Sequence, residues 1–585
     1  MIQNLLRRLA VAACALAFAG AAYAQKIAIT DATVFDATGA DPFVATVVIS
    51  DGRIESVIPG GKAPRGARVI RAKGMALVPG FFDLHTHFTA NGSPRAAPQI
   101  NQAYVAAGVT TVNDFHQPPE AFAARQTWYL SMPSPHVNFA ARMSTQGGHG
   151  ADWADQNTTK WVNTPFAAKE AVTALLPYKP GAIKVFADGW RYGSGVDNTS
   201  MDLPTLSAIV ETAHTAKLPV LTHTVTVERG KIAAKAGVDV IAHSLQDVPV
   251  DQELIDLMLK SGTAYAPTLA VYEPVKPGQP SPASDDANLK VRKTRFGISL
   301  GNVKALHDAG VPIALGTDAG MPSTPHGLST LREMELLVEA GLTPSEALIA
   351  GTANSAKAIG QTDRGIIEAG KLADLVLIDG KPWQTISDVR KIVRTFVDGK
   401  TVFDKGATRP LSEEYPPALV SPQALIADFQ RLDGRTASGA LPVMDIDGGK
   451  ERSTQIMTVV ERDESGRFLS VHARMAPREK PHTEIVLPLT PGAVVPVDAR
   501  AFKGVRFDFH GKGEYRLGVM TTSGLWTHAF SSDGGWAAVQ VPFEQLVTSA
   551  EGANWTPGAI LAVHFMIERG AGEAAWMEID DISFY

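Results

Sequence analysis

Cysteine is almost missing from this chain of 585 residues. The single cysteine, Cys14, lies within an apolar stretch close to the N-terminus. The rest of the chain therefore cannot form a disulfide bond, offers no thiolate nucleophile and cannot bind zinc through cysteine. The side chains left for a metal site are those of histidine, aspartate, glutamate and lysine.

Charge of one sign and long hydrophobic runs are also scarce. Charged residues make up 19% of the chain, the net charge is −6, and no basic run follows the N-terminus, so we expect no nucleic-acid partner. The apolar stretch 9–22 is too short for a permanent membrane span, and no later run is long enough. It follows two arginines and ends in a small-residue motif at Ala24. This pattern predicts a signal peptide over residues 1–24 and a periplasmic or secreted protein.

The length calls for more than one domain, and 45% apolar residues are enough to build the cores. Short apolar strands alternate with helical stretches over residues 76–359. The candidate strands are 75–79, 109–113, 136–140, 182–186, 219–222, 238–242, 263–267 and 312–316. Eight such strands predict an α/β fold, a (β/α)8 TIM barrel, in which catalytic groups stand at the C-terminal ends of the strands.

The segments on either side of this barrel have a different pattern. Residues 25–75 and 360–408 alternate in the manner of strands, and we expect them to form one small β-sandwich domain that flanks the barrel. Residues 409–440 are rich in Pro, Ala and Ser and are predicted to be a linker. Residues 441–585 are strand-like and rich in aromatic residues, which predicts a separate all-β jelly-roll domain.

Two histidines one residue apart, His85 and His87, are the first candidate metal ligands. Side chains alternate along a strand, so both imidazoles point the same way and one ion can bind both. Alone, this pair is a weak signal. Further candidates stand at the ends of later predicted strands: Lys184, His223, His243 and Asp318. A buried core histidine would explain any one of them, but their occurrence in order on one barrel face favours a metal site.

These motifs together resemble the metal-dependent amidohydrolase superfamily, particularly its imidazolonepropionase-like and prolidase-like branch. The resemblance runs from about residue 26 to residue 405. It is carried by segments 79–87, 183–184, 316–320, 351–354 and 370–374, and by His223 and His243. Together these motifs are highly specific.

The resemblance implies two divalent metal ions, expected to be Zn²⁺. The implied ligands are His85, His87 and Asp318 for one ion, His223 and His243 for the other, and a carbamylated Lys184 as the bridge. A carbamate would turn a buried cation into an oxygen ligand. The alternative is a mononuclear site that uses His85, His87, His223 and Asp318 and leaves Lys184 unmodified.

The same resemblance implies the chemistry of the site. The metal ions would activate a hydroxide nucleophile, and Asp318 would take its proton and pass it to the leaving amine. His243 would help to stabilise the developing oxyanion.

Several loop residues are candidates for substrate binding. His149 stands on a glycine-flanked loop after the third strand, and His326 follows the eighth. Trp190, Arg191 and Tyr192 come after Lys184, where prolidase-like relatives usually carry a glycine-rich turn, so we expect a different pocket wall. Arg191 would be suited to bind a carboxylate, and a solvated loop explains these three residues equally well.

The C-terminal segment has a weaker resemblance of its own. Segments 502–509, 515–519, 536–543 and 579–582 resemble the complex I intermediate-associated protein family, which has a galactose-binding-like jelly roll. We expect a non-catalytic accessory module there.

The sequence thus predicts an exported hydrolase that cleaves an amide C–N bond in a dipeptide or N-acyl amino acid. Its expected partner is a small amide or peptide substrate, with no membrane span, and a homo-oligomer is left open. One alternative is a cyclic amidohydrolase or deaminase of the imidazolonepropionase type. The other is a binding protein that has lost catalysis.

Overall fold

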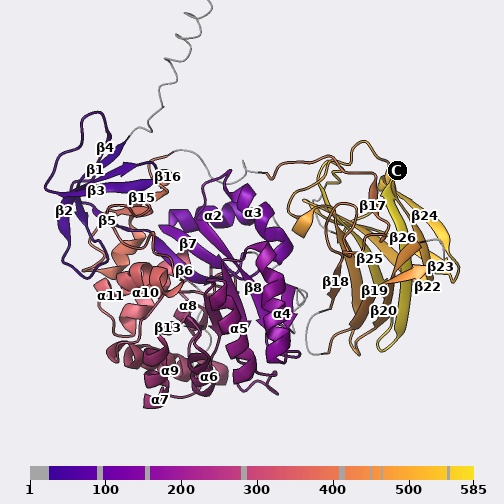
Figure 1. The fold of residues 1–585 in the computed structure, drawn as a ribbon, viewed down its shortest axis with the longest axis horizontal. Coiled ribbons are helices and arrows are strands. Elements are labelled where there is room, and N and C mark those ends of the chain that lie inside the picture. The colour runs from indigo at the N-terminus through magenta and orange to yellow at the C-terminus, as the bar shows by residue number, and fades with distance from the viewer. Residues whose placement is uncertain are drawn as a thin grey trace, which may run out of the picture.

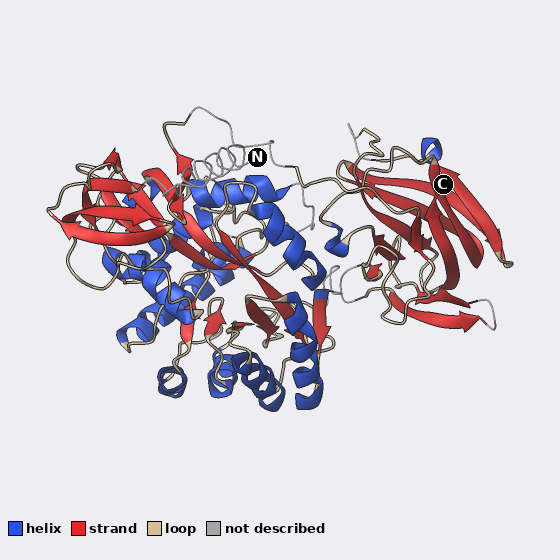
Figure 2. Cartoon of the chain, turned by 45° about the horizontal axis from the view of Figure 1, so that its top comes forward, coloured by secondary structure: helices blue, strands red, loops and turns tan. Residues whose placement is uncertain are grey.

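The structure is a computed structural model that describes residues 26–88, 96–151, 158–278, 286–407, 416–447, 451–462, 466–549 and 554–585. The predicted signal peptide and Cys14 lie outside these residues. A small β-domain, a helix-covered barrel and a C-terminal all-β region follow one another across the molecule (Figures 1 and 2). No helix among the described residues is long and apolar enough to cross a membrane.

The small β-domain joins strands from both sides of the barrel in one sheet. Its strands are β1 (Ile27–Val34), β2 (Phe43–Ser50), β3 (Arg53–Pro59), β4 (Arg68–Arg71), β5 (Ala76–Pro79), β14 (Leu375–Ile378), β15 (Ile392–Val397) and β16 (Lys400–Asp404). The order is β16-β15-β14-β5-β1-β2-β3, with β4 paired to β1. Alternating apolar residues of these strands, such as Ile29, Val47 and Leu375, form its core.

One strand assignment was wrong. The strand predicted at 75–79 exists as β5, but it pairs with β1 and β14 in the small domain, and the first barrel strand is β6 (Phe81–Thr86). The chain passes from one sheet to the other at Gly80, where a Cβ atom would lie only 2.0 Å from Oγ1 of Thr110. β5 is short and apolar, as a buried barrel strand would be, and only Gly80 separates it from β6, so sequence pattern alone could not assign the two strands to different sheets.

The predicted (β/α)8 barrel is confirmed. After β6 its strands are β7 (Val109–Asp114), β8 (His136–Ser144), β10 (Ala182–Phe186), β11 (Val220–His223), β12 (Val240–Ala242) and β13 (Ala264–Ala266), and β9 (Thr159–Trp161) pairs with the edge of β8. All these pairings are parallel. The eighth position is extended chain around 312–316, which closes the barrel through Ala314 N–H to Tyr265 O and Leu84 N–H to Leu315 O, both 2.9 Å.

Helices cover the outside of the barrel. They are α2 (Ala97–Ala106), α3 (Phe122–Tyr129), α4 (Pro165–Leu175), α5 (Leu203–Thr215), α6 (Val227–Ala236), α7 (Gln252–Ser261), α8 (Leu269–Tyr272), α9 (Ala287–Asp308), α10 (Leu328–Glu339), α11 (Pro344–Ile349) and α12 (Ser355–Ala358). N-cap residues mark where some of these helices begin. The side chains of Asp202 and Asp251 accept hydrogen bonds from backbone N–H groups in the first turns of α5 and α7. Apolar side chains between strands and helices form the main core.

The C-terminal region is an antiparallel all-β structure. Its strands are β17 (Leu425–Ala427), β18 (Val443–Ile446), β19 (Thr454–Arg462), β20 (Gly466–Arg474), β21 (His482–Pro488), β22 (Gly504–Thr521), β23 (Gly524–Asp533), β24 (Ala537–Pro542), β25 (Ile560–Glu568) and β26 (Ala574–Phe584). The long β22 pairs with β23, β24, β25 and β26. β17 pairs with β26 although it lies within the predicted linker, so ordered structure begins earlier than predicted. The galactose-binding-like likeness stays a prediction.

This region packs on the barrel through a few defined contacts. The guanidinium of Arg435 donates to both carboxylate oxygens of Glu120, at 3.0 and 3.1 Å. Gly492 lies so close to Ala121 that a Cβ atom there would be 2.4 Å from its Cα, and Val494 is buried in the main core. The guanidinium of Arg452 donates to the carbonyl oxygen of Ala151 at 2.5 Å.

Candidate metal centre

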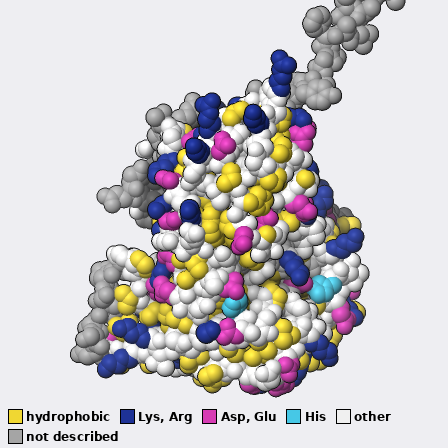
Figure 3. Space-filling model, turned by 90° about the vertical axis from the view of Figure 1, so that its left-hand side faces the viewer, with side chains coloured by type: hydrophobic (Ala, Val, Ile, Leu, Met, Phe, Trp, Pro, Cys, Tyr) yellow, Lys and Arg dark blue, Asp and Glu magenta, His cyan; other side chains and the backbone are white. Residues whose placement is uncertain are grey.

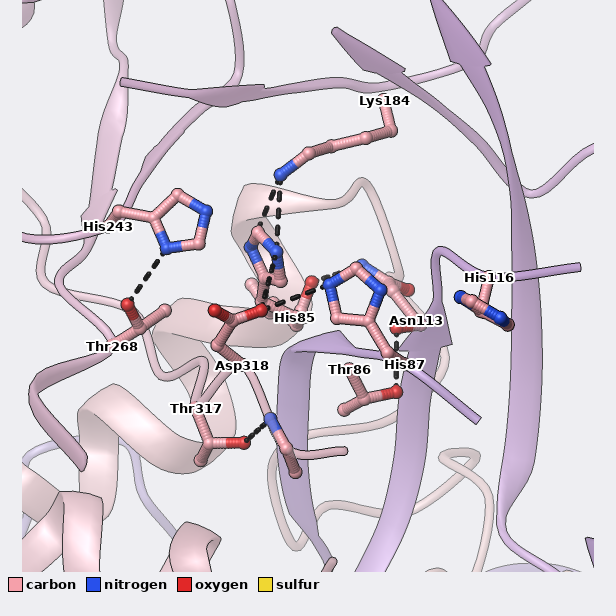
Figure 4. A network of polar contacts seen from close by, with 12 residues as sticks. His85, Thr86, His87, Asn113, His116, Lys184, His243, Thr268, Thr317 and Asp318 are labelled. Atoms are coloured by element: carbon pink, nitrogen blue, oxygen red, sulfur yellow. Dashed lines mark hydrogen bonds and ion pairs between the residues drawn. The ribbon is translucent and has the colours of Figure 1, made fainter. Parts of the chain in front are cut away.

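The first strand of the barrel brings two imidazoles to one carboxylate. His85 ends up within β6 and His87 just after it, both buried. Oδ1 of Asp318 lies 3.0 Å from Nε2 of His87 and 3.4 Å from Nε2 of His85 (Figure 4). The backbone N–H of Asp318 donates to the carbonyl oxygen of His85 at 2.8 Å, so the closing segment of the barrel delivers this carboxylate.

Two more imidazoles complete the cluster from strands β11 and β12. The His243 ring centroid lies 4.3 Å from that of His85 and 4.4 Å from that of His223. Nδ1 of His243 is 3.1 Å from Oγ1 of Thr268, so that contact leaves Nε2 for another partner. Burial lowers the pKa of His85, His223 and His243 well below the ordinary value. Neutral imidazoles are the form that binds metal ions.

Lys184 reaches into the same cluster from the middle of β10. Its side chain is fully buried, and Nζ lies 3.2 Å from Nε2 of His85 and 4.8 Å from the ring centroid of Phe115 (Figure 4). Burial lowers its pKa to about 7, and the charge of Asp318 opposes this only in part. The fold thus holds an amine that is substantially uncharged at neutral pH, surrounded by imidazoles and aromatic rings.

The backbone at the strand ends is unusual. His243, Thr268 and Asp318 have φ values of 81°, 46° and 62°, in the left-handed region that residues other than glycine seldom adopt. Each costs about 1 kcal/mol or more, a cost that proteins tend to carry at functional sites. The strain coincides here with the polar cluster.

The buried carboxylate of Asp83 links the strand and the segment that carry the candidate ligands. Asp83 accepts hydrogen bonds from the backbone N–H and Oγ1 of Thr317, at 3.1 and 2.7 Å, and from Oγ1 of Thr330 at 2.8 Å. Burial raises its pKa to about 7, and these hydrogen bonds oppose the rise. Asp83 therefore ties β6, which carries His85, to the segment that carries Asp318.

The chemistry of the donor set fits a metal ion. One ligand atom each from His85, His243 and Asp318 lie within 4.8 Å of one another. His87, His223 and Lys184 lie around this group, so the structure brings all six predicted ligands together at the C-terminal end of the barrel. Histidine nitrogen and carboxylate oxygen are the donors of cysteine-free zinc sites.

The residues predicted to bind substrate do not all lie against the ligand cluster. The His149 ring stacks at a tilt against His223, 4.3 Å between centroids, so it borders the cluster. Trp190 and Tyr192 lie together, 5.1 Å between centroids. The backbone N–H of Arg191 donates to Oδ1 of Asp197 at 2.9 Å within a turn. The binding of a substrate carboxylate by the Arg191 side chain stays a prediction.

His326 lies behind the cluster. Its Nε2 is 3.0 Å from the carbonyl oxygen of His87, and its ring packs against Phe88 and Tyr104. It also lines a cavity of about 1330 Å³ between α2, α10 and the C-terminal region. This placement favours support of His87 over contact with a substrate at the metal centre.

Sequence reasoning missed three residues near the site. Thr268 holds His243, and Tyr272 stands edge-on against the His243 ring with 6.1 Å between centroids. The buried Glu333 accepts from the backbone N–H groups of Leu269 and Ala270, at 2.8 and 2.7 Å, and so fixes the turn that carries both. The position of Thr268 after the seventh predicted strand was a usable signal, but nothing local marks Tyr272 or Glu333.

A second group of histidine and aspartate lies at the opposite end of the barrel. His136, which begins β8, has Nε2 at 3.2 Å from Asp374 and 3.5 Å from Asp398. Their ligand atoms also lie within 4.8 Å of one another. Arg364 lies 3.5 Å from Asp374, which makes this an ion-pair network that joins the barrel to the small domain.

Comparison with known proteins identifies the class. Residues 76–402 match the model of the amidohydrolase family, which is more than half of the chain, and the chain belongs to this family. Imidazolonepropionase of Idiomarina loihiensis is 27% identical over 374 residues, which cover 57% of this chain and 85% of that protein. Imidazolonepropionase of Shouchella clausii is 41% identical over only 110 residues, 18% of this chain and 24% of that protein.

The solved structures agree with the fold. A candidate prolidase from Bifidobacterium longum has 28% identity and a TM-score of 0.57, over 66% of this chain and 97% of that one. The family and these likenesses support a hydrolase that acts on carbon–nitrogen bonds.

Proposed function

We propose that this protein is an exported, binuclear metal-dependent hydrolase that cleaves the amide bond of a dipeptide or N-acyl amino acid. One observation carries the proposal: four imidazoles, one carboxylate and a lysine amine whose pKa burial lowers to about 7 converge at the C-terminal end of an amidohydrolase barrel. An uncharged amine is the form that reacts with CO₂ to give a carbamate, so the low pKa of Lys184 favours that modification.

The ligands would be His85, His87 and Asp318 for one ion and His223 and His243 for the other, with carbamylated Lys184 between them. Bound divalent ions, with zinc expected, supply Lewis acidity toward water and toward the amide carbonyl. Asp318 keeps 12% of its side chain exposed, so its carboxylate is not closed off from water. It would accept a proton from water and deliver it to the leaving amine.

The neighbours of Asp318 determine which of its two carboxylate oxygens remains free. Nε2 of His85 and Nε2 of His87 both face the same oxygen, Oδ1, which leaves Oδ2 for proton transfer. The hydrogen bond between Nδ1 of His243 and Thr268 fixes the direction of that ring.

The substrate class is supported by two kinds of relative. The likeness to a candidate prolidase favours a peptide or N-acyl amino acid. The sequence relatives described above are imidazolonepropionases, and this favours a cyclic amide as the second candidate substrate. The amino-terminal signal peptide pattern is the support for export.

The test combines metal analysis with a substrate panel. Protein purified without chelators and supplemented with zinc should hold about two ions per chain, and should hydrolyse a member of a panel of dipeptides, N-acetyl amino acids and imidazolonepropionate. Hydrolysis of imidazolonepropionate alone would assign the second candidate. One ion or fewer per chain would contradict the binuclear site, and a metal-loaded protein inactive on the whole panel would contradict the proposed substrates.

A further inference from the structure

Two tyrosines from separate loops meet beside the metal centre. The hydroxyl oxygens of Tyr192 and Tyr272 lie 3.0 Å apart. Tyr192 follows β10, and Tyr272 ends the short helix α8 after β13. Both side chains are half-buried, so each keeps some surface toward open space. The pair therefore bridges two loops at the C-terminal end of the barrel.

The pair contains one more O–H group than its mutual contact uses. A hydrogen bond between two phenols needs one donor, which leaves the second O–H to donate elsewhere. Among the residues that the structure describes, neither hydroxyl makes another hydrogen bond. A donor of this kind beside a metal centre is suited to an acceptor on a bound molecule.

Tyr272 is the member closer to the cluster. Its ring stands edge-on to His243, at an interplanar angle of 86° and 6.1 Å between centroids. Tyr192 contacts Tyr272 and Trp190 instead. The order from the metal centre outward is thus His243, Tyr272 and Tyr192.

Both loops are fixed in place by buried or charged partners. The carbonyl oxygen of Tyr192 accepts from the guanidinium of Arg295 at 2.8 Å, and that guanidinium lies 5.2 Å from the centroid of the Trp190 ring. Tyr192 has a left-handed backbone, φ 55°, which these contacts must maintain. On the other side, Glu333 holds the first two N–H groups of α8. The phenols are therefore preorganised.

We propose that the O–H of Tyr272 donates a hydrogen bond to the acyl oxygen of the amide that is cleaved, and that Tyr192 donates to Tyr272 and orients it. This assignment rests on the proposed amide hydrolysis. A preorganised donor gains strength as negative charge develops on the acyl oxygen, so it lowers the barrier more than it strengthens substrate binding. Tyr272 is then a catalytic residue, and Tyr192 is a positioning residue.

The experiment is a double-mutant cycle on the zinc-loaded full chain, with the panel member that the wild type hydrolyses best. Tyr272→Phe should lower kcat about 100-fold with little change in KM. Tyr192→Phe should lower kcat about 10-fold, because Tyr272 loses its orienting partner. The double variant should match Tyr272→Phe, because Tyr192 acts only through Tyr272. Tyr178→Phe, which removes a hydroxyl near Arg435 at the domain contact, is the matched control and should leave kcat and KM unchanged.

Acetohydroxamate provides a readout that does not depend on turnover. It is a metal-binding molecule with an acyl oxygen, and its affinity for the zinc-loaded protein should fall about 10-fold in Tyr272→Phe with zinc content unchanged. Equal kcat and equal acetohydroxamate affinity in wild type and Tyr272→Phe would overturn the assignment, as would losses that multiply in the double variant. If no amide is hydrolysed but the affinity still depends on Tyr272, the donor role stands and the proposed amide hydrolysis falls.

Discussion

Among single residues, Lys184 is the sharpest test of the metal centre. Its amine is fully buried against His85 and Phe115, where an ammonium ion is poorly solvated. If Lys184 serves as the stem of a carbamate, Lys184→Ala should abolish activity and reduce metal content. Acetate or formate should partly restore both, because a free carboxylate can occupy the vacated space. The measurement is zinc per chain and kcat at increasing concentrations of acetate or formate.

Asp318→Asn is the contrasting variant. It removes a ligand and the proton acceptor together, so kcat should fall by about 100-fold or more and short acids should not restore it. Near-normal turnover and two ions in Lys184→Ala would contradict the role of Lys184 as a carbamate bridge. Near-normal turnover with a single ion would leave the mononuclear site, with His85, His87, His223 and Asp318, in its place.

Between elements, Asp188 joins the end of β10 to the start of α6. Its Oδ1 accepts from the N–H of Trp190 at 2.9 Å, and its Oδ2 accepts from Val225 N–H, Thr226 N–H and Thr226 Oγ1 at 3.1, 2.9 and 2.7 Å. An amide offers only one oxygen for these four donors. Asp188→Asn should therefore lower the free energy of unfolding by about 1–3 kcal/mol in urea denaturation. The control is Asp197→Asn, an exposed acceptor in the same loop, and an equal loss in both variants would contradict this role.

The contact between β8 and the small domain should depend on pH. Burial lowers the pKa of His136, but hydrogen bonds to Asp374 and Asp398 outweigh it and raise the pKa from 6.5 to about 9, with Arg364 as the opposing charge. Because the folded pKa is the higher one, the stabilisation is complete below pH 6.5 and is lost as the pH rises through about 9. The shift corresponds to about 3 kcal/mol.

His136→Asn removes this titration. The difference in free energy of unfolding between wild type and variant should be larger at pH 6 than at pH 9.5, measured by urea denaturation at both values. A difference that stays constant across this range would show that His136 contributes packing alone.

At the same scale, the sequence predicted most barrel strands to within a few residues because short, mainly apolar segments such as β11, β12 and β13 alternate with helical stretches. It failed at β5, whose apolar run is indistinguishable from that of a barrel strand. The histidine candidates were found because β6, β11 and β12 present them at or just after a C-terminal end, whereas Lys184 was found as a charged residue in the middle of the apolar β10. The Tyr192–Tyr272 contact joins residues 80 positions apart, and no local pattern reports a contact set by tertiary packing.

For the whole molecule, the net charge of −6 is small against 54 basic and 60 acidic residues. On the side shown in Figure 3, Lys and Arg side chains are interspersed with Asp and Glu. The face shown there has no broad field of one sign that would attract a polyanion or polycation from a distance. The loops around the candidate metal centre are therefore the place to look for substrate selection.

The C-terminal region reaches one of those loops. The guanidinium of Arg452 donates to the carbonyl oxygen of Ala151 and lies 5.8 Å from the centroid of the Trp161 ring. Ala151 comes two residues after His149, whose ring lies against His223. The C-terminal region thus contacts the loop that borders the candidate metal centre, although none of the proposed ligands lies within this region.

A chain that ends at residue 407 should therefore keep its metal ions but bind substrate less tightly. All six proposed ligands lie between residues 85 and 318, so zinc per chain should not change. KM should rise several-fold because the loop of His149 loses its contact with Arg452, a loss of about 1 kcal/mol for one hydrogen bond. Removing the region also uncovers the core beneath Val494, so the shortened chain should denature at a lower temperature.

Two variants of the full chain separate these effects. Arg452→Ala should reproduce the higher KM with the full thermal stability of the wild type. Arg435→Ala, which breaks the ion pair with Glu120 elsewhere in the same interface, should leave KM unchanged. If Arg435→Ala raised KM as much as Arg452→Ala, the effect would come from loosened docking as a whole. A soluble, folded chain ending at residue 407 that bound no metal would place a ligand in the C-terminal region and contradict the proposed centre.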